Sequence, residues 1–157
     1  MRLSRFLLLI ASSALMGLSA HAEDRPASWA EWESSKKPGD KEMVARIEKA
    51  DWWKNCAAWG VASRQKTKTR RFWALQDYLR HTNTINAKDL GYVNERLPTI
   101  GMTTCGAVAV LGLPSSANNS QSKYGYRTQF VFRQRGVYVY TESTDGDGNA
   151  LITSLQH

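Results

Sequence analysis

The chain has 157 residues, a hydrophobic content of 42% and a formal net charge of +7. This length suits one domain with a hydrophobic core, and the charge is too modest to indicate nucleic-acid binding by itself. Two cysteines and three scattered histidines do not provide the ligand spacing of a zinc site.

The N-terminus has the three parts of a secretory signal peptide. A basic start with Arg2 and Arg5 precedes an apolar run over 6–18 and an Ala-His-Ala cleavage signal at 20–22. The apolar run is too short to span a membrane. We therefore expect residues 1–22 to be removed, which lowers the net charge to +5. We predict a soluble periplasmic protein, or a secreted one, that meets no nucleic acid. The residue directly after the cleavage signal is Glu23 and not a cysteine, so we expect no lipoprotein acylation there.

Residues 23–40 are polar, contain two prolines and show little periodicity. This composition predicts a linker or a loosely docked arm. Trp29 and Trp32 lie in this arm at helical spacing. We expect them to pack back on the body of the protein, and the alternative is that they bind a partner.

Residues 41–97 are predicted to be helical. A first helix is expected from Asp40 to Ser63, and Cys56 lies on its wide apolar face. A second helix should run from a Thr69 cap to His81, and a capping-box-like pair at Asn86 and Asp89 predicts a short third helix. The residues expected to face the core are Met43, Ile47, Ala50, Ala57 and Val61 in the first helix and Phe72, Leu75 and Leu79 in the second.

Residues 98–157 are predicted to contain one short helix and three strands. Thr103 should cap a helix over 105–111 that ends at Gly112. A polar loop is expected over 115–125, followed by antiparallel strands that start at Tyr126, Val137 and Ala150. The predicted fold class is α+β, with the helices packed on a three-stranded antiparallel meander.

Cys56 and Cys105 are the two cysteines of the chain, and three chemistries are open to them. A nucleophilic Cys105 needs a base, and only His81 and His157 remain after export. A free or intermolecular thiol is a second alternative. In an exported chain, two cysteines most simply form a disulfide, and we predict the pair Cys56–Cys105.

No other pattern indicates catalysis or a cofactor. The run "DGDGN" from Asp145 is similar to a calcium loop, but Ala150 and Gln156 occupy the positions that need Gly and Glu. We predict a hairpin turn there, without a metal. The sequence shows neither paired carboxylates nor a Ser/His/Asp set, so we predict a non-catalytic protein. A small thiol-dependent or glycan-acting enzyme is the weaker alternative.

Two groups of residues are candidates for partner binding. The basic run 64–71 suits an anionic lipid or glycan, and the alternative is a solvated helix boundary. Trp52 and Trp53 are adjacent on a helix and should point about 100° apart, which leaves one ring near the edge of the buried face. The partner-binding candidates are Trp52, Trp53, Trp73, Arg70 and Arg71.

The C-terminal part resembles a known family over about residues 98–157. The matching positions are Gly101, Met102, Gly112, Pro114, Gln129, Phe130, Val131, Phe132, Tyr138, Tyr140, Ile152, Thr153, Ser154 and Gln156. Their order is similar to that of the SmpA/OmlA (BamE-like) domain of bacterial envelope proteins.

This resemblance implies helices packed on a three-stranded sheet and a non-catalytic role, binding a partner protein in the envelope. The same architecture occurs in secreted inhibitors of β-lactamase, so an inhibitor or immunity protein against an enzyme is the alternative. The chain departs from the family in two ways. The family's well-known assembly factors are lipoproteins, whereas this chain lacks the lipid-bearing cysteine, and the helices before residue 98 lie outside the family pattern.

Overall fold

The computed structural model describes residues 25–157, and the predicted signal peptide lies outside them. The helices are α1 (Trp29–Ser34), α2 (Asp40–Lys49), α3 (Trp52–Ser63), α4 (Arg70–His81), α5 (Ala87–Tyr92), α6 (Thr104–Leu111) and the 3-10 helix η1 (Arg133–Arg135). The strands are β1 (Ser116–Ser122), β2 (Gly125–Phe132), β3 (Val137–Ser143) and β4 (Ile152–Gln156).

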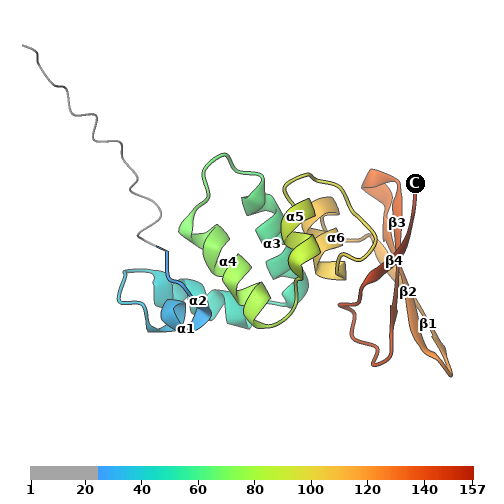
Figure 1. Ribbon diagram of the computed structural model, residues 1–157, viewed down its shortest axis with the longest axis horizontal. Helices are drawn as coiled ribbons and strands as arrows, with labels where there is room; N and C mark the ends of the chain where they lie inside the picture. Colours follow the sequence, from blue (N-terminus) through green and yellow to red (C-terminus); the bar gives the residue numbers. More distant parts are fainter. Residues whose placement is uncertain (1–24) are drawn as a thin grey trace, which may run out of the picture.

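Helices α1–α6 lie on one side of a single sheet, and no other part of residues 25–157 covers its second face (Figure 1). The sheet has four strands in the order β1-β2-β3-β4, and each neighbouring pair is antiparallel. The α+β class and the antiparallel meander are therefore confirmed, with one strand more than predicted.

The additional strand is β1, in a segment that was predicted to be a loop. It pairs with β2 along its whole length, from Ser116 opposite Val131 to Ser122 opposite Gly125. The strand has no alternating apolar pattern because it lies at the exposed edge of the sheet, with almost every residue open to solvent. Its main-chain bonds to β2 make it a strand, and its polar side chains protect the edge from pairing with other chains.

The predicted single helix over 40–63 is wrong, because the chain forms two helices there. Ala50 is extended, with ψ 145°, and it ends α2. The Asp51 side chain then accepts the Trp53 N–H at 3.1 Å and caps a new helix, α3. This break changes which face of α3 is buried, so Val61 is 53% exposed instead of facing the core.

The described part of the predicted arm, residues 25–40, is more ordered than a linker. Ser28 caps α1, and this helix buries both Trp29 and Trp32. The expectation that these two rings pack back on the body is confirmed. The arm has no periodicity beyond its two tryptophans because α1 is only six residues long.

The other predicted helix starts are confirmed. The side chain of Thr69 caps α4, the side chain of Thr103 caps α6, and Asn86 and Asp89 form a complete capping box at the start of α5. Three residues of α4 were predicted to point inward, and all are buried: Phe72, Leu75 and Leu79.

One core joins the segments 41–97 and 98–157. Helix α6 is buried along almost its whole length and crosses α3 at the predicted disulfide, whose Cys56 and Cys105 Cα atoms are 5.3 Å apart. Gly60 lies against the main chain of Ala109 on the same two helices. The fold is therefore one unit rather than a helical segment attached to a separate sheet domain.

A buried carboxylate connects α5 to the start of α6. Asp89 is fully buried and accepts the N–H of Asn86 at 2.7 Å, the N–H of Thr103 at 2.9 Å and the hydroxyl of Thr103 at 2.9 Å. Burial raises the pKa of Asp89 above its ordinary value, although these three hydrogen bonds oppose the shift. Gly106 gives the carboxylate its space, because a Cβ there would lie 2.0 Å from Asp89 Oδ1.

Candidate functional site

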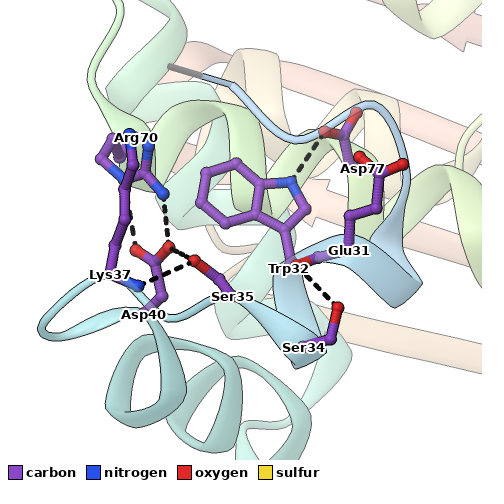
Figure 2. Close-up of polar contacts among 8 residues, drawn as sticks. All are labelled: Glu31, Trp32, Ser34, Ser35, Lys37, Asp40, Arg70 and Asp77. Carbon is purple, nitrogen blue, oxygen red and sulfur yellow. Dashed lines mark hydrogen bonds and ion pairs between the residues drawn. The ribbon is translucent and has the colours of Figure 1, made fainter.

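Arg70, a predicted partner-binding residue, forms an ion pair with another residue of the same chain. Its guanidinium pairs with Asp40, and the Nε–Oδ1 distance is 3.2 Å (Figure 2). The Asp40 side chain is only 3% exposed and also accepts the Ser35 hydroxyl. Burial favours the neutral acid, but the hydrogen bonds of Arg70 and Ser35 and the charges of Arg70 and Lys37 lower the pKa of Asp40.

A second ion pair holds the same arm on α4. Asp77 is buried and accepts the Trp32 indole Nε1–H at 3.0 Å (Figure 2). Arg25 donates to the same carboxylate, with a distance of 3.2 Å from its Nε. The Arg70 guanidinium lies 4.8 Å from the Trp32 ring centroid. The two arginines therefore dock the N-terminal arm.

The three candidate tryptophans are half-buried against the core. Trp52 and Trp53 are not splayed as predicted, because their rings stack with centroids 4.1 Å apart. The Trp53 ring also meets Phe130 edge-on, and a Cβ on Gly148 would lie 3.5 Å from Trp52 and 3.6 Å from Trp53. This pair therefore supports the β3–β4 loop from beneath. The Arg25 guanidinium lies over the Trp73 ring, with its Cζ 4.1 Å from the ring centroid.

The basic run 64–71 is divided between several roles. Lys68 donates to the main-chain carbonyls of Ser63 and Gln65 and so caps the end of α3. Arg64 donates to the carbonyl of Ala109 at 3.1 Å. Arg71 is exposed. The run is thus partly a structural helix boundary and partly a surface charge.

The uncovered face of the sheet presents a continuous polar and aromatic surface, here called the outer sheet face. The strand register places on it Asn118, Arg127, Gln129, Tyr138, Tyr140, Glu142 and Gln156. Tyr138 is 40% exposed, and Arg127 and Glu142 form an ion pair across β2 and β3 at 3.4 Å. Tyr side chains supply large, amphipathic contact area, which makes such a surface suitable for protein binding.

A chain of hydrogen bonds crosses all four strands on this face. The Asn118 amide donates to Gln129 Oε1 at 3.0 Å, and the Gln129 amide donates to the Tyr140 hydroxyl at 2.7 Å. Tyr140 then donates to Gln156 Oε1 at 2.8 Å. Each member donates in the same direction, so the bonds polarise and strengthen one another. We call these four residues the ladder, and they hold one defined arrangement of side chains on an open surface.

A groove of about 940 Å³ begins where the outer sheet face ends. It is lined by the ends of β1, β2 and β3, by the β3–β4 loop and by the loop between α4 and α5. Arg127 and Glu142 belong to both the groove and the outer sheet face, so the two are continuous. The groove contains three carboxylates, those of Glu142, Asp145 and Asp147, and one guanidinium, and Tyr124 is 82% exposed at its rim. The groove is therefore acidic on a chain that is basic overall.

The structure also locates the groups considered for catalysis. Both cysteines are in the disulfide, and His81 is exposed at the end of α4. Asp145 and Asp147 accept main-chain N–H groups two residues further along the β3–β4 loop, as in a tight turn. Within residues 25–157, no three His, Cys, Asp or Glu side chains are grouped so that they could hold a metal ion.

Most of the ladder could have been found from the sequence. The alternation over 126–133 predicts that Gln129 and Phe130 point to different faces of the sheet. The same period in β3 places Tyr140 and Val139 on different faces. Asn118 had no such signal because β1 was not recognised as a strand. The sequence signals for binding were tryptophan density and positive charge, and both led to residues that mainly pack the core.

No family model, curated protein or solved structure matches the chain. In the part of the chain described, no helix has both the length and the hydrophobicity needed to cross a membrane. The fold defines a disulfide-linked α+β protein with a four-stranded antiparallel sheet.

Proposed function

We propose that the protein is an exported, non-catalytic periplasmic protein that binds another cell-envelope protein through its outer sheet face. The observation that carries this proposal is the ladder of Asn118, Gln129, Tyr140 and Gln156, which orders side chains on a surface that none of the described helices covers. An ordered surface loses less side-chain entropy on binding than a mobile one, so it favours association.

The composition of this surface suits a protein partner. Tyr138 and Tyr140 offer aromatic contact area to a partner. The amide side chains around them form a polar rim that can hydrogen-bond to that partner. The acidic groove continues from the same face, which favours a partner that places Lys or Arg side chains at that end.

Export is supported by two features of the chain. Residues 1–22 have the pattern of a signal peptide, and Cys56 and Cys105 form a disulfide, which is stable in oxidising compartments. The resemblance of residues 98–157 to SmpA/OmlA (BamE-like) domains points to the same compartment and to protein binding.

Site-specific photocrosslinking in envelope preparations tests this proposal. A benzophenone amino acid in place of Tyr138 should give a discrete protein adduct, because this side chain lies on the outer sheet face. The same probe in place of Ala45, exposed on α2, serves as the control and should give none.

Further substitutions link the adduct to the ladder. Gln129→Ala with Gln156→Ala removes two of its members and should weaken the crosslink at position 138 about tenfold or more. An adduct at Ala45 alone, or none at either position, would contradict the proposal. An adduct with a secreted enzyme would favour the alternative function, an inhibitor or immunity protein.

A further inference from the structure

Three arginines from separate parts of the sequence meet at one edge of the molecule. Arg64 follows the last turn of α3, Arg96 lies in the loop after α5, and Arg135 belongs to η1. The end of α3, this loop and η1 lie along the upper edge in Figure 1. Burial, together with repulsion by the charges of Arg96 and Arg135, lowers the pKa of the Arg64 guanidinium. Arg64 is therefore close enough to both Arg96 and Arg135 to be repelled by their charges.

This edge has almost no compensating negative charge. Its segments also carry Lys66, Lys68 and Arg133, and Glu95 is the one acid among residues 61–69, 93–97 and 133–136. The ion pairs between described residues involve none of these arginines. Arg64 instead donates to the carbonyl of Ala109, which holds its guanidinium in place. Like charges held together raise the free energy of the free protein, and a bound anionic surface relieves that repulsion.

Exposed aliphatic side chains accompany these cations. Val61 is 53% exposed in the last turn of α3, and Arg64 is the residue that directly follows this helix. Leu97, next to Arg96, is 58% exposed. Leu113 is 57% exposed, and two residues later Ser115 accepts the N–H of Arg133 at 3.3 Å, which brings this loop to η1. Single exposed apolar residues are common, but here Val61 and Leu97 lie within three residues of a cation in the sequence, and the loop of Leu113 contacts η1.

Cations mixed with aliphatic side chains are the composition of a surface that rests on a membrane. The cations bind anionic head groups, and the aliphatic groups enter the boundary between head groups and acyl chains. A nucleic acid or a free anion would use the charges only. The aliphatic side chains therefore favour an anionic lipid.

We propose that Arg64, Arg96 and Arg135, with Val61, Leu97 and Leu113, form a peripheral binding site for anionic phospholipid membranes. None of these residues belongs to the outer sheet face, so the proposed site and that face use different side chains. It refines the lipid contact predicted for 64–71, because Arg70 and Lys68 are engaged within the fold while Arg96 and Arg135 come from other elements.

Co-sedimentation with vesicles tests this site. The chain purified after export should sediment with phosphatidylglycerol vesicles and not with phosphatidylcholine vesicles. The variant Arg64→Gln/Arg96→Gln/Arg135→Gln should bind about a hundredfold more weakly, since each cation near an anionic surface contributes about 1 kcal/mol, or about fivefold. Its matched control is Lys41→Gln/Lys49→Gln/Lys54→Gln, which removes the same charge from exposed positions of α2 and α3. The vesicle affinity of this control should fall by less than a tenth of the factor expected for the arginine variant.

Additional arms separate the alternatives. Leu97→Ser/Leu113→Ser should weaken vesicle binding, and inorganic phosphate or a duplex oligonucleotide at matched charge should not displace the protein. Equal losses in the two triple variants, displacement by either competitor, or no effect of the leucine changes would overturn the proposal. If Arg64→Gln lowers the melting temperature because its bond to Ala109 is lost, Arg96→Gln/Arg135→Gln provides the test and should bind about twenty-fivefold more weakly than the unmodified chain.

Discussion

The main chain at Gly60 lies so close to Ala109 that a Cβ on residue 60 would be 1.9 Å from the Ala109 carbonyl oxygen. The Cys56–Cys105 disulfide lies four residues earlier on both helices. The two contacts are thus one helical turn apart on α3 and on α6, so the helices run in the same direction past each other. Glycine normally destabilises the interior of a helix, but here its missing side chain allows the two main chains to approach this closely.

We predict that Gly60→Ala destabilises the fold. Helix propensity alone favours Ala, but main-chain atoms of Ala109 cannot move aside as a side chain can. The expected loss is about 3 kcal/mol, or a melting temperature about 10 °C lower. Gly91→Ala in α5 is the control, since no atom lies within 4 Å of its Cβ position, and it should be neutral or slightly stabilising. Equal melting temperatures for the two variants would show that the close approach is not tight.

The disulfide should contribute a large part of the stability. Its cysteines are 49 residues apart. Closing a loop of this size lowers the entropy of the unfolded chain and raises the free energy of unfolding by about 4 kcal/mol. The double variant Cys56→Ala/Cys105→Ala should therefore unfold at a clearly lower urea concentration with a native-like spectrum before the transition. Alkylation of both thiols in the unreduced protein, measured by mass spectrometry, would contradict the bond itself.

The Asp40–Arg70 pair should make the arm sensitive to acid. The pKa of Asp40 is lower in the fold than its ordinary value of 3.8, so its contribution is present above 3.8 and is lost as the pH falls through the lower folded value. Asp40→Asn should cost about 2 kcal/mol near neutral pH, because Arg70 loses its charged partner. The difference from the unmodified protein should shrink as the pH falls below 3.8 and through the lower folded value.

Chemical denaturation from pH 2 to 7 measures this effect. Glu42→Gln is the matched control, because Glu42 pairs with Arg46 on an exposed surface where both side chains are more than three-quarters open to solvent. We expect almost no change from that variant. A pH-independent loss in Asp40→Asn would show that packing, not charge, holds the arm.

Asp89 should show the opposite dependence on pH. Its pKa is raised in the fold, so its contribution to stability is largest below 3.8 and declines as the pH rises through the folded value. Asp89→Asn should cost about 2 kcal/mol at low pH, because the amide NH2 group would face the N–H donors of Asn86 or Thr103, whereas both oxygens of the neutral acid still offer lone pairs.

The advantage of the unmodified protein over Asp89→Asn should then shrink as the pH rises above 3.8. Unfolding free energies over the same pH series provide the measurement. An advantage that grows with pH would show that the hydrogen bonds outweigh burial at this carboxylate.

Caps, turns and cysteine chemistry were sufficient to predict much of this fold. Thr69, Asn86 and Thr103 start helices because each places a side-chain acceptor directly before a helical segment and binds an N–H three residues later. The disulfide followed from the number of cysteines and the export signal. The break at Asp51 was missed because the apolar pattern continues across it, and a local cap determined the outcome.

The remaining features depend on contacts between residues far apart in the chain. β1 is a strand because β2 supplies its hydrogen bonds, so its own side chains carry no pattern. Arg70 looked like a surface cation, yet Asp40, thirty residues away, binds it. The ladder, the acidic groove and the meeting of Arg64, Arg96 and Arg135 likewise arise only where the folded chain brings distant segments together. Periodicity and capping act within one element, whereas pairing, charge neutralisation and exposed surfaces are determined by neighbours in space.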